Sequence, residues 1–527
     1  MDKIIKLYIN EMFKLSRKAS TIVLLILMIV ACFLLPLFIK VNQDLFLGSG
    51  SSDFEISSSL TQQKSDWENR IAQIESEISA LEGSEDAAMQ IYSLQMEMVD
   101  AKAQIESIDL MLENNITGYD KNGFVYQAVV SIPSLRRDLA ELATLKEADR
   151  DDAWAYKNAL YEEGIDLAYS SIKTKDFKAY IDFEKRQWQA NTSGILDDAS
   201  IKQIIEQNEM WYRLDPSGGT DGQHNYNDVS ASLTKLFEMK YELSSGVTAE
   251  ETMNGSSYTS MSPKREAELR DQIAVLEYRI ENDNLVLASE SPLWNFAKSF
   301  SVSLGQFLIT ILLLVVAGSA ISQEIATGSI KSLIIAPVRR WKIFTAKLLS
   351  LLTTGIIAVI ILCVFSNIGA SVFMGTSAMV PYVYVSGSAV LSMPYWLYDL
   401  LHIFAENAST MVYCSFAFML SIITRNTALS VGLSIATLFT TSTAAALLDG
   451  LPFPHQLWMD FLPFMNFDLT GDLFPFSSLM EPLGSIMTSY EMPIIRPSLQ
   501  FSIIYLIVLL FCILYIGFDS FTRSDIK

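Results

Sequence analysis

Charged residues, histidine and cysteine are all scarce in this chain of 527 residues. Only 18% of the residues are charged, against about 25% in typical soluble domains. The three histidines, His224, His402 and His455, lie far apart in the sequence, and no cysteine has a close cysteine neighbour, so a zinc site is not expected. The long polar block at residues 41–297 contains no cysteine at all, which excludes a disulfide framework there and suits a bacterial surface.

Nucleotide-binding and hydrolase motifs are also missing. No G-x-x-x-x-G-K-[ST] occurs, and the nearest match, GSIKS at residues 328–332, lacks the first glycine and the spacing of a P-loop. Neither G-x-S-x-G nor H-E-x-x-H is found. We therefore expect no catalytic residues, no metal and no cofactor in this chain, and any ATP to be hydrolysed by another subunit.

Apolar residues, in contrast, are abundant and concentrated in long runs. They make up 50% of the chain, and the mean hydropathy is +0.28. Residues 21–39 carry no charge, and nineteen residues in a helix are enough to cross about 30 Å of hydrocarbon. The run is too long for a signal-peptide core and is not followed by a cleavage site. With five further runs, the sequence predicts an all-α membrane protein with six transmembrane helices, the later ones near residues 301–322, 348–373, 400–423, 428–448 and 499–518.

Charge divides the chain into two parts. Residues 41–297 hold 46 acidic and 22 basic residues, whereas the whole chain has a net charge of −21. The remainder is therefore slightly basic. This partition predicts one acidic extramembrane domain at residues 41–297 and one membrane domain, with the first transmembrane helix at 21–40 and the others within 298–527. An acidic surface also argues against nucleic acid as a partner.

Basic residues in the short loops indicate the orientation. Five precede the first run, five lie in residues 323–347, Arg425 lies in the next short loop on the same side, and Arg523 and Lys527 lie in the tail. With six spans all of these fall on one side, which the positive-inside rule makes cytoplasmic. We expect a multi-pass protein of the bacterial cell membrane, with both termini in the cytoplasm and residues 41–297 outside.

Heptad-like apolar stripes mark both ends of the acidic domain. They are flanked by polar residues, as in coiled coils. Because one stripe leaves the membrane and another returns to it, we expect a mainly helical domain with an antiparallel coiled-coil-like stalk, although packing within a globular domain would give the same pattern. The stripes are Trp67, Ile71, Ile74, Ile78 and Leu81; Ile91, Leu94, Met98, Ala101, Ile105, Ile108 and Leu112; and Leu269, Ile273, Leu276, Ile280 and Leu287.

Residues 323–347, QEIATGSIKSLIIAPVRRWKIFTAK, interrupt two apolar runs with five bases and one acid. Gly328 and Pro337 are expected to bound a short amphipathic helix at the cytoplasmic face. Such a helix, with basic residues around it, could anchor to lipid headgroups or dock on another protein.

This loop resembles the one between the second and third spans of type-2 ABC transporter permeases. The order Glu, Gly, Pro, Arg, Lys is matched by Glu324, Gly328, Pro337, Arg339 and Lys347. Residues 11–18, EMFKLSRK, are similar to that family's amphipathic connecting helix, which we assign to residues 1–20. FLPFMNFDL at 461–469 is similar to its outer region, where short re-entrant helices are common. The resemblance implies that the loop couples the permease to a separate ATPase, with the other basic residues of the loop as further candidates for this contact: Lys331, Arg340 and Lys342.

Ionisable residues inside the expected spans are few. His402 and Glu406 are four residues apart in the fourth span, so they would share one helical face, and Asn407 follows. Polar groups at that depth usually face a partner or a watery cavity. They are candidates for lining a substrate path or a dimer seam, and the alternative is a solvated position near the outer interface.

The resulting hypothesis is a permease subunit of an ABC exporter that moves a lipid, peptide or drug-like amphiphile outward. Its expected partners are a cytoplasmic ABC ATPase, a second permease copy or a homologous permease, and membrane lipids. Two alternatives remain open. One is a stalked permease that transmits ATP-driven motion to outside partners, and the other is a non-transporting scaffold or receptor with an external coiled coil.

Overall fold

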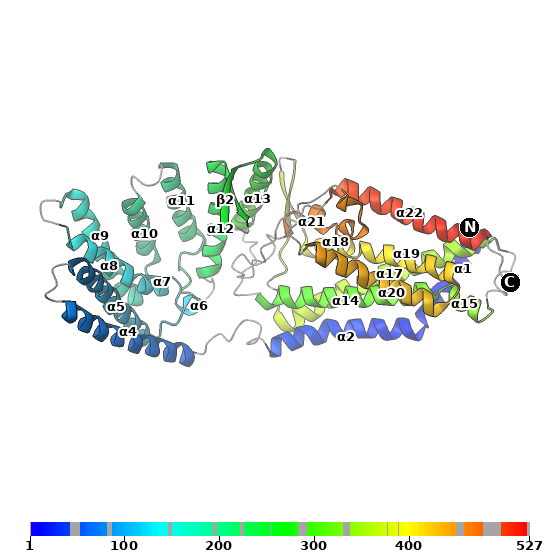
Figure 1. Cartoon of the computed structure of the whole chain (residues 1–527), viewed down its shortest axis with the longest axis horizontal. Coiled ribbons are helices and arrows are strands. Elements are labelled where there is room, and N and C mark those ends of the chain that lie inside the picture. Colours follow the sequence, from blue (N-terminus) through cyan, green and yellow to red (C-terminus); the bar gives the residue numbers. More distant parts are fainter. Residues whose placement is uncertain are drawn as a thin grey trace. The chain divides into compact units, whose positions relative to one another are not determined.

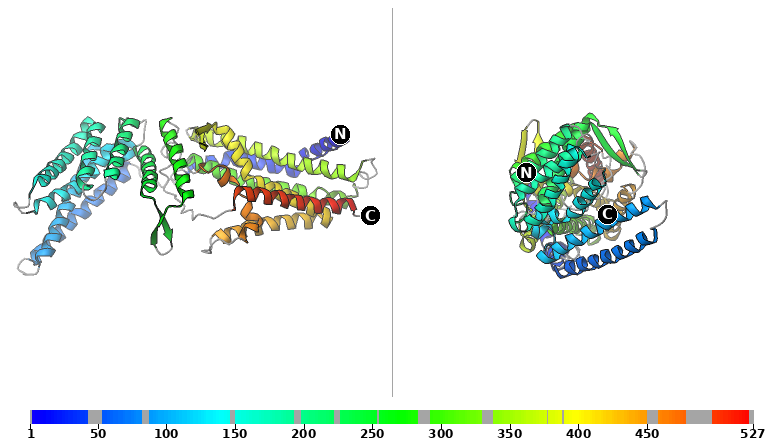
Figure 2. Two further views of the ribbon diagram at one scale, coloured as in Figure 1. Left: turned by 90° about the horizontal axis from the view of Figure 1, so that it is seen from above. Right: turned by 90° about the vertical axis from the view of Figure 1, so that its left-hand side faces the viewer.

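The computed structural model describes residues 2–42, 53–81, 87–145, 150–192, 198–221, 226–252, 255–282, 292–329, 338–376, 378–387, 389–449, 458–477 and 497–523. These residues form two compact units (Figures 1 and 2). We call the first the span unit, which contains the described residues before 43 and after 291. The second is the insert unit, built from described residues within 53–282.

The span unit confirms the expectation of six membrane-length helical segments. Each segment is long and apolar enough to cross a bilayer. The fourth is made of two helices, and a short amphipathic helix, α1 (Asp2–Ser16), precedes the first. The segments are α2 (Ala19–Val41), α14 (Pro292–Ser319) with α15 (Ser322–Ala326), α17 (Arg340–Met374), α18 (Tyr395–Glu406) with α19 (Ala408–Thr424), α20 (Thr427–Asp449) and α22 (Leu499–Arg523).

Helix α14 packs against α2, α17 and α19, and Figure 1 shows it next to α2. Its apolar residues Leu313 and Leu314 are fully buried. Helices α2 and α22, in contrast, leave large apolar side chains such as Leu34 and Phe511 more than half exposed. Apolar surface of this kind on the rim of a bundle is what lipid-facing helices require.

The fourth segment differs from the single helix expected at residues 400–423. It begins earlier, at Tyr395, and is broken at Asn407, where α18 ends and α19 begins. The Asn407 side chain is buried and donates from Nδ2 to the Ile403 carbonyl at 2.8 Å. An asparagine that bonds to its own backbone in this way competes with helix propagation, which accounts for the break.

Two β-hairpins correct the all-α expectation. In the span unit, β3 (Tyr382–Ser386) pairs antiparallel with β4 (Ala389–Met393). In the insert unit, β1 (Val247–Thr252) pairs antiparallel with β2 (Gly255–Ser260). The sequence YVYVS alternates aromatic and β-branched residues, which favours a strand, but it is too short to stand out beside the long apolar helices.

Short helices follow the fifth span, at the FLPFMNFDL segment. They are η2 (Met459–Phe461), η3 (Pro463–Asn466) and α21 (Thr470–Leu473). Asn466 is fully buried, and its Nδ2 donates to the Asp460 and Leu462 carbonyls while its Oδ1 accepts from Ser502 Oγ at 2.9 Å. This side chain ties the short helices to α22.

The insert unit is mainly helical, as expected. Its first two helices, α4 (Asp53–Leu81) and α5 (Ala88–Asn114), run antiparallel, because Lys64 pairs with Asp109 and Arg70 with Glu97. The helices that follow are α6 (Tyr119–Asn122), α7 (Phe124–Val130), α8 (Ile132–Ala143), α9 (Asp152–Thr174), α10 (Phe177–Thr192), α11 (Asp198–Leu214), α12 (Tyr226–Ser245) and α13 (Pro263–Glu281).

The pairing of the heptad stripes differs from the expected stalk. The two stripes near the start pair with each other in the α4–α5 hairpin, whereas the returning stripe lies on α13 and packs on α12. Leu269 and Leu276 of α13 are fully buried against Leu233 and Leu236 of α12. Each stripe thus finds an apolar face on a helix that is close in sequence, which closes a shorter loop at a lower entropic cost. Leu287, the last residue of the returning stripe, lies outside the described residues.

Candidate functional site

A buried ion-pair network joins α1 to both ends of the 323–347 loop. Lys347, in the second turn of α17, is only 3% exposed. Its Nζ lies 2.9 Å from Glu11 Oε2 of α1 and 2.8 Å from Glu324 Oε1 of α15. Lys14, one turn after Glu11, lies 3.0 Å from Glu11 Oε1 and 3.5 Å from Glu324 Oε1. Four alternating charges thereby hold α1 to two segments that lie more than 300 residues further along the chain.

The network keeps the Glu11 carboxylate ionised. Burial by itself raises the pKa of Glu11, but the Lys347 and Lys14 ammonium groups outweigh it, and the pKa of Glu11 falls below its ordinary value. Burial likewise lowers the pKa of Lys14, but its contacts with Glu11 and Glu324 raise that pKa overall. Glu11 and Lys14 are therefore both charged at neutral pH.

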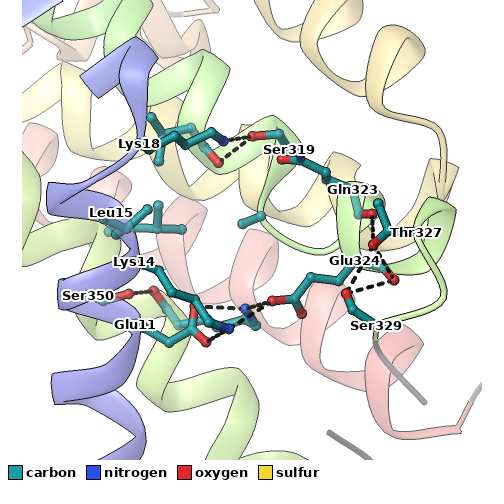
Figure 3. A pocket seen from close by; sticks show the side chains of 14 residues that line it. Glu11, Lys14, Leu15, Lys18, Ser319, Gln323, Glu324, Thr327, Ser329 and Ser350 are labelled. Atoms are coloured by element: carbon teal, nitrogen blue, oxygen red, sulfur yellow. Dashed lines mark hydrogen bonds and ion pairs between the residues drawn. The ribbon is translucent and has the colours of Figure 1, made fainter. Parts of the chain in front are cut away.

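A cavity of about 340 Å³ lies beside this network (Figure 3). Side chains of α1, α14, α15 and α17 line it. Lys18, just after α1, reaches across to α14, where its Nζ donates to Ser319 Oγ at 2.6 Å. The other polar side chains of the lining include Gln323 and Ser350. The cavity thus lies where α1 meets the ends of the second and third candidate spans.

The remaining loop residues fall into distinct environments. Gly328 has a φ of +71°, a left-handed conformation that favours glycine. Arg339 is exposed and precedes α17, whereas Arg340 donates from Nη1 to the Thr522 carbonyl of α22 at 3.2 Å. Lys342 lies 5.6 Å from the centre of the Trp341 ring. Lys331 and Pro337 lie outside the described residues.

The three candidates of the fourth span do not form one cluster. His402 packs between the rings of Tyr398 and Phe474, with both ring-centre distances at 5.5 Å. Glu406, on the same face of α18, is half-buried, and its backbone carbonyl accepts from Gln306 Nε2 of α14 at 2.9 Å. Asn407 lies at the helix break, and its buried Oδ1 has no hydrogen-bond partner in the described part of the chain.

A second buried polar cluster was not predicted from the sequence. Lys298 of α14 forms an ion pair with Asp399 of α18, and the Tyr395 hydroxyl contacts the same ammonium. Asn367 of α17 donates to Asp399 Oδ2 at 2.6 Å, and both charged residues are less than 10% exposed. The sequence signal was a lone lysine and a lone aspartate just outside two apolar runs. Extending each helix by one turn would have placed both inside the bundle.

The described residues contain no cluster of three or more histidine, cysteine or acidic side chains that could hold a metal. The two buried charge clusters instead pair lysine ammonium groups with carboxylates of other helices.

These features define a multi-pass membrane protein with six candidate spanning helices and two buried charge clusters between them. Residues 268–527 match the family described as "Protein of unknown function (DUF2705)". The chain is also 27% identical over 264 residues to the uncharacterized protein YhcI of Bacillus subtilis (strain 168), an alignment that covers 49% of this chain and 76% of the relative. No solved structure matches the chain.

Proposed function

We propose that this chain is the permease subunit of an ABC exporter, driven by a separate ATPase that docks at the 323–347 loop. The observation that carries the proposal is the network of Glu11, Lys347 and Glu324. It joins an amphipathic N-terminal helix to the two ends of a basic loop between the second and third candidate spans. This arrangement suits a membrane subunit that receives force from an ATPase subunit.

Force transmission requires stiffness between the loop and the spans. Charge-assisted hydrogen bonds at 2.8 and 2.9 Å hold α1, α15 and α17 together, so a displacement of the loop would move these helices as one body. A motor subunit would then shift the spans between two arrangements, provided that it contacts the loop differently in each. The basic side chains around Arg339 would complement an acidic groove on such a partner.

Co-purification tests the proposal directly. We expect the tagged chain, extracted in mild detergent, to retain an ATPase subunit, and the reconstituted pair to show substrate-dependent ATP hydrolysis. Arg339→Glu combined with Lys342→Glu should abolish retention of the ATPase without loss of folded permease. These two positions avoid Arg340, whose guanidinium is bonded to α22.

Arg523→Glu is the control, because Arg523 is 79% exposed and, among the described residues, pairs only with Asp519 one turn away. It should leave ATPase retention unchanged. If no ATPase is retained by the wild-type chain, or if the double variant retains it normally, the proposal fails.

The α4–α5 hairpin favours one second candidate, a stalked permease that transmits motion to outside partners. A reconstituted pair in which residues 51–291 are replaced by a short flexible linker separates the two functions. An exporter should keep its ATP-coupled transport, whereas a force-transmitting permease should hydrolyse ATP and lose its effect on outside partners.

A further inference from the structure

The cavity beside the ion-pair network lies at the level of lipid headgroups. Lys18 immediately precedes α2, and Ser319 is the last residue of α14, so both stand at the end of a candidate span. Ser350 lies in the third turn of α17, near the start of another. A cavity at the common end of three candidate spans, beside an amphipathic helix, would face the phosphate layer of a bilayer that these spans cross.

The cavity carries one positive charge in excess. Its lining holds three ammonium groups and two carboxylates. Glu11 and Glu324 are both engaged by Lys14 and Lys347. Lys18, within the described part of the chain, has no carboxylate partner and is held only by the Ser319 hydroxyl. Burial, and then repulsion from Lys347, lower the pKa of Lys18, so an anion placed beside it would favour its charged form.

One more side chain of the lining can contact a bound anion. Gln323 has an exposed side-chain amide that can donate. Glu324 Oε2, in contrast, is shielded from solvent, so a ligand in the cavity does not reach it.

We propose that this cavity binds the headgroup of an anionic phospholipid, with the phosphodiester at Lys18 and Gln323. A phosphodiester brings a single negative charge, which matches the single excess positive charge of the lining. Free phosphate at neutral pH brings more negative charge toward Glu324 and lacks the acyl chains that would lie along the exposed apolar side chains of α2. The volume, on the order of ten water molecules at about 30 Å³ each, holds a phosphoglycerol group. The proposal does not depend on the transport function proposed above.

Lipid titration of the full chain tests this site. The detergent-purified protein is titrated with phosphatidylglycerol, phosphatidylcholine or sodium phosphate, and bound ligand is counted by native mass spectrometry. We expect one phosphatidylglycerol to bind more tightly than phosphatidylcholine. Lys18→Gln should weaken it by about tenfold, the size expected for losing a charged hydrogen bond.

Arg17→Gln is the matched control, because it removes the same charge one residue away. Arg17 is exposed and lies over the Phe13 ring, outside the lining. This variant should change the affinity by less than about twofold, as expected for a diffuse surface charge. Gln323→Ala is a second test variant, at an exposed position where the change should not affect folding. It should weaken the binding of phosphatidylglycerol only.

Three results would overturn the proposal. Equal weakening by Lys18→Gln and Arg17→Gln would mean that only diffuse attraction acts. Equal affinity for phosphatidylglycerol and phosphatidylcholine would exclude recognition of the headgroup. Sodium phosphate that binds as tightly as phosphatidylglycerol, with the same loss in Lys18→Gln, would assign the cavity to a soluble anion instead of a lipid.

Discussion

Lys347 shows how strongly a single residue can depend on its partners. Its ammonium group is almost fully buried and is balanced by Glu11 and Glu324. A buried charge is tolerated only while its counter-charges remain, so removing one partner is far more damaging than removing both.

We expect Lys347→Met to destabilise the folded span unit by about 3–5 kcal/mol, because it leaves Glu11 buried without its main counter-charge. Lys347→Met combined with Glu11→Gln should recover part of this loss. Unfolding in mixed micelles, followed by tryptophan fluorescence, measures both. A double variant that is as unstable as the sum of its single variants would show that the two side chains do not interact.

Glu11 also sets an acid limit on the same contact. Its pKa in the folded state lies below the ordinary 4.5, so the stabilisation that it provides is complete above that value and is lost as the pH falls through the folded-state pKa. When the pH is lowered from neutral to acid, we expect the Glu11→Gln variant to lose less stability than the wild type. The thermal midpoint measured across that range checks the sign, and a steeper acid loss in the variant would contradict it.

Helix α2 depends on a close approach to α17 at one glycine. A Cβ added at Gly369 would lie 1.9 Å from the Cys32 carbonyl oxygen, which belongs to the backbone and cannot move aside alone. We expect Gly369→Ala to cost about 1–3 kcal/mol by forcing the two helices apart. Gly432→Ala in α20 is the control, since a Cβ there meets nothing within 4 Å, and it should not lower the thermal midpoint.

At the scale of elements, the sequence was informative where a pattern was long. The six apolar runs and the heptad stripes predicted helices close to the observed ones. Burial of a whole helix face depends on many residues together, so the pattern is repeated along the sequence. The partners of the stripes were not predictable, since an apolar stripe on α13 fits α4 and α12 equally well until chain connectivity is considered.

The candidate site was predictable only in part. Glu324 and Lys347 were named from the loop, and the structure brings them together with Glu11. The pair of Lys298 and Asp399 was missed because its members lie 101 residues apart and each stands at the edge of an apolar run. No local spacing encodes such a contact, which depends on how the helices pack.

For the whole molecule, the central prediction is the orientation of its two units. In a background without native cysteines, Ser245→Cys in the insert unit should react with a membrane-impermeant maleimide on intact cells. Ser16→Cys, at the end of α1, should react only after the membrane is opened. Both serines are exposed, so access depends on the side of the membrane alone. Labelling of Ser16→Cys on intact cells would invert the orientation.

The position of the insert has a consequence for biogenesis. Helix α2 packs on α14 and α17, yet the ribosome must make more than 250 further residues before those helices exist. If the insert unit lies outside the cell, as predicted, the first span stays in the lipid without these helices during that interval, while the insert is exported and folds. Completion of the membrane bundle is therefore a late, post-insertion event, and a stalled or misfolded insert would leave an orphaned anchor for quality-control proteases to remove.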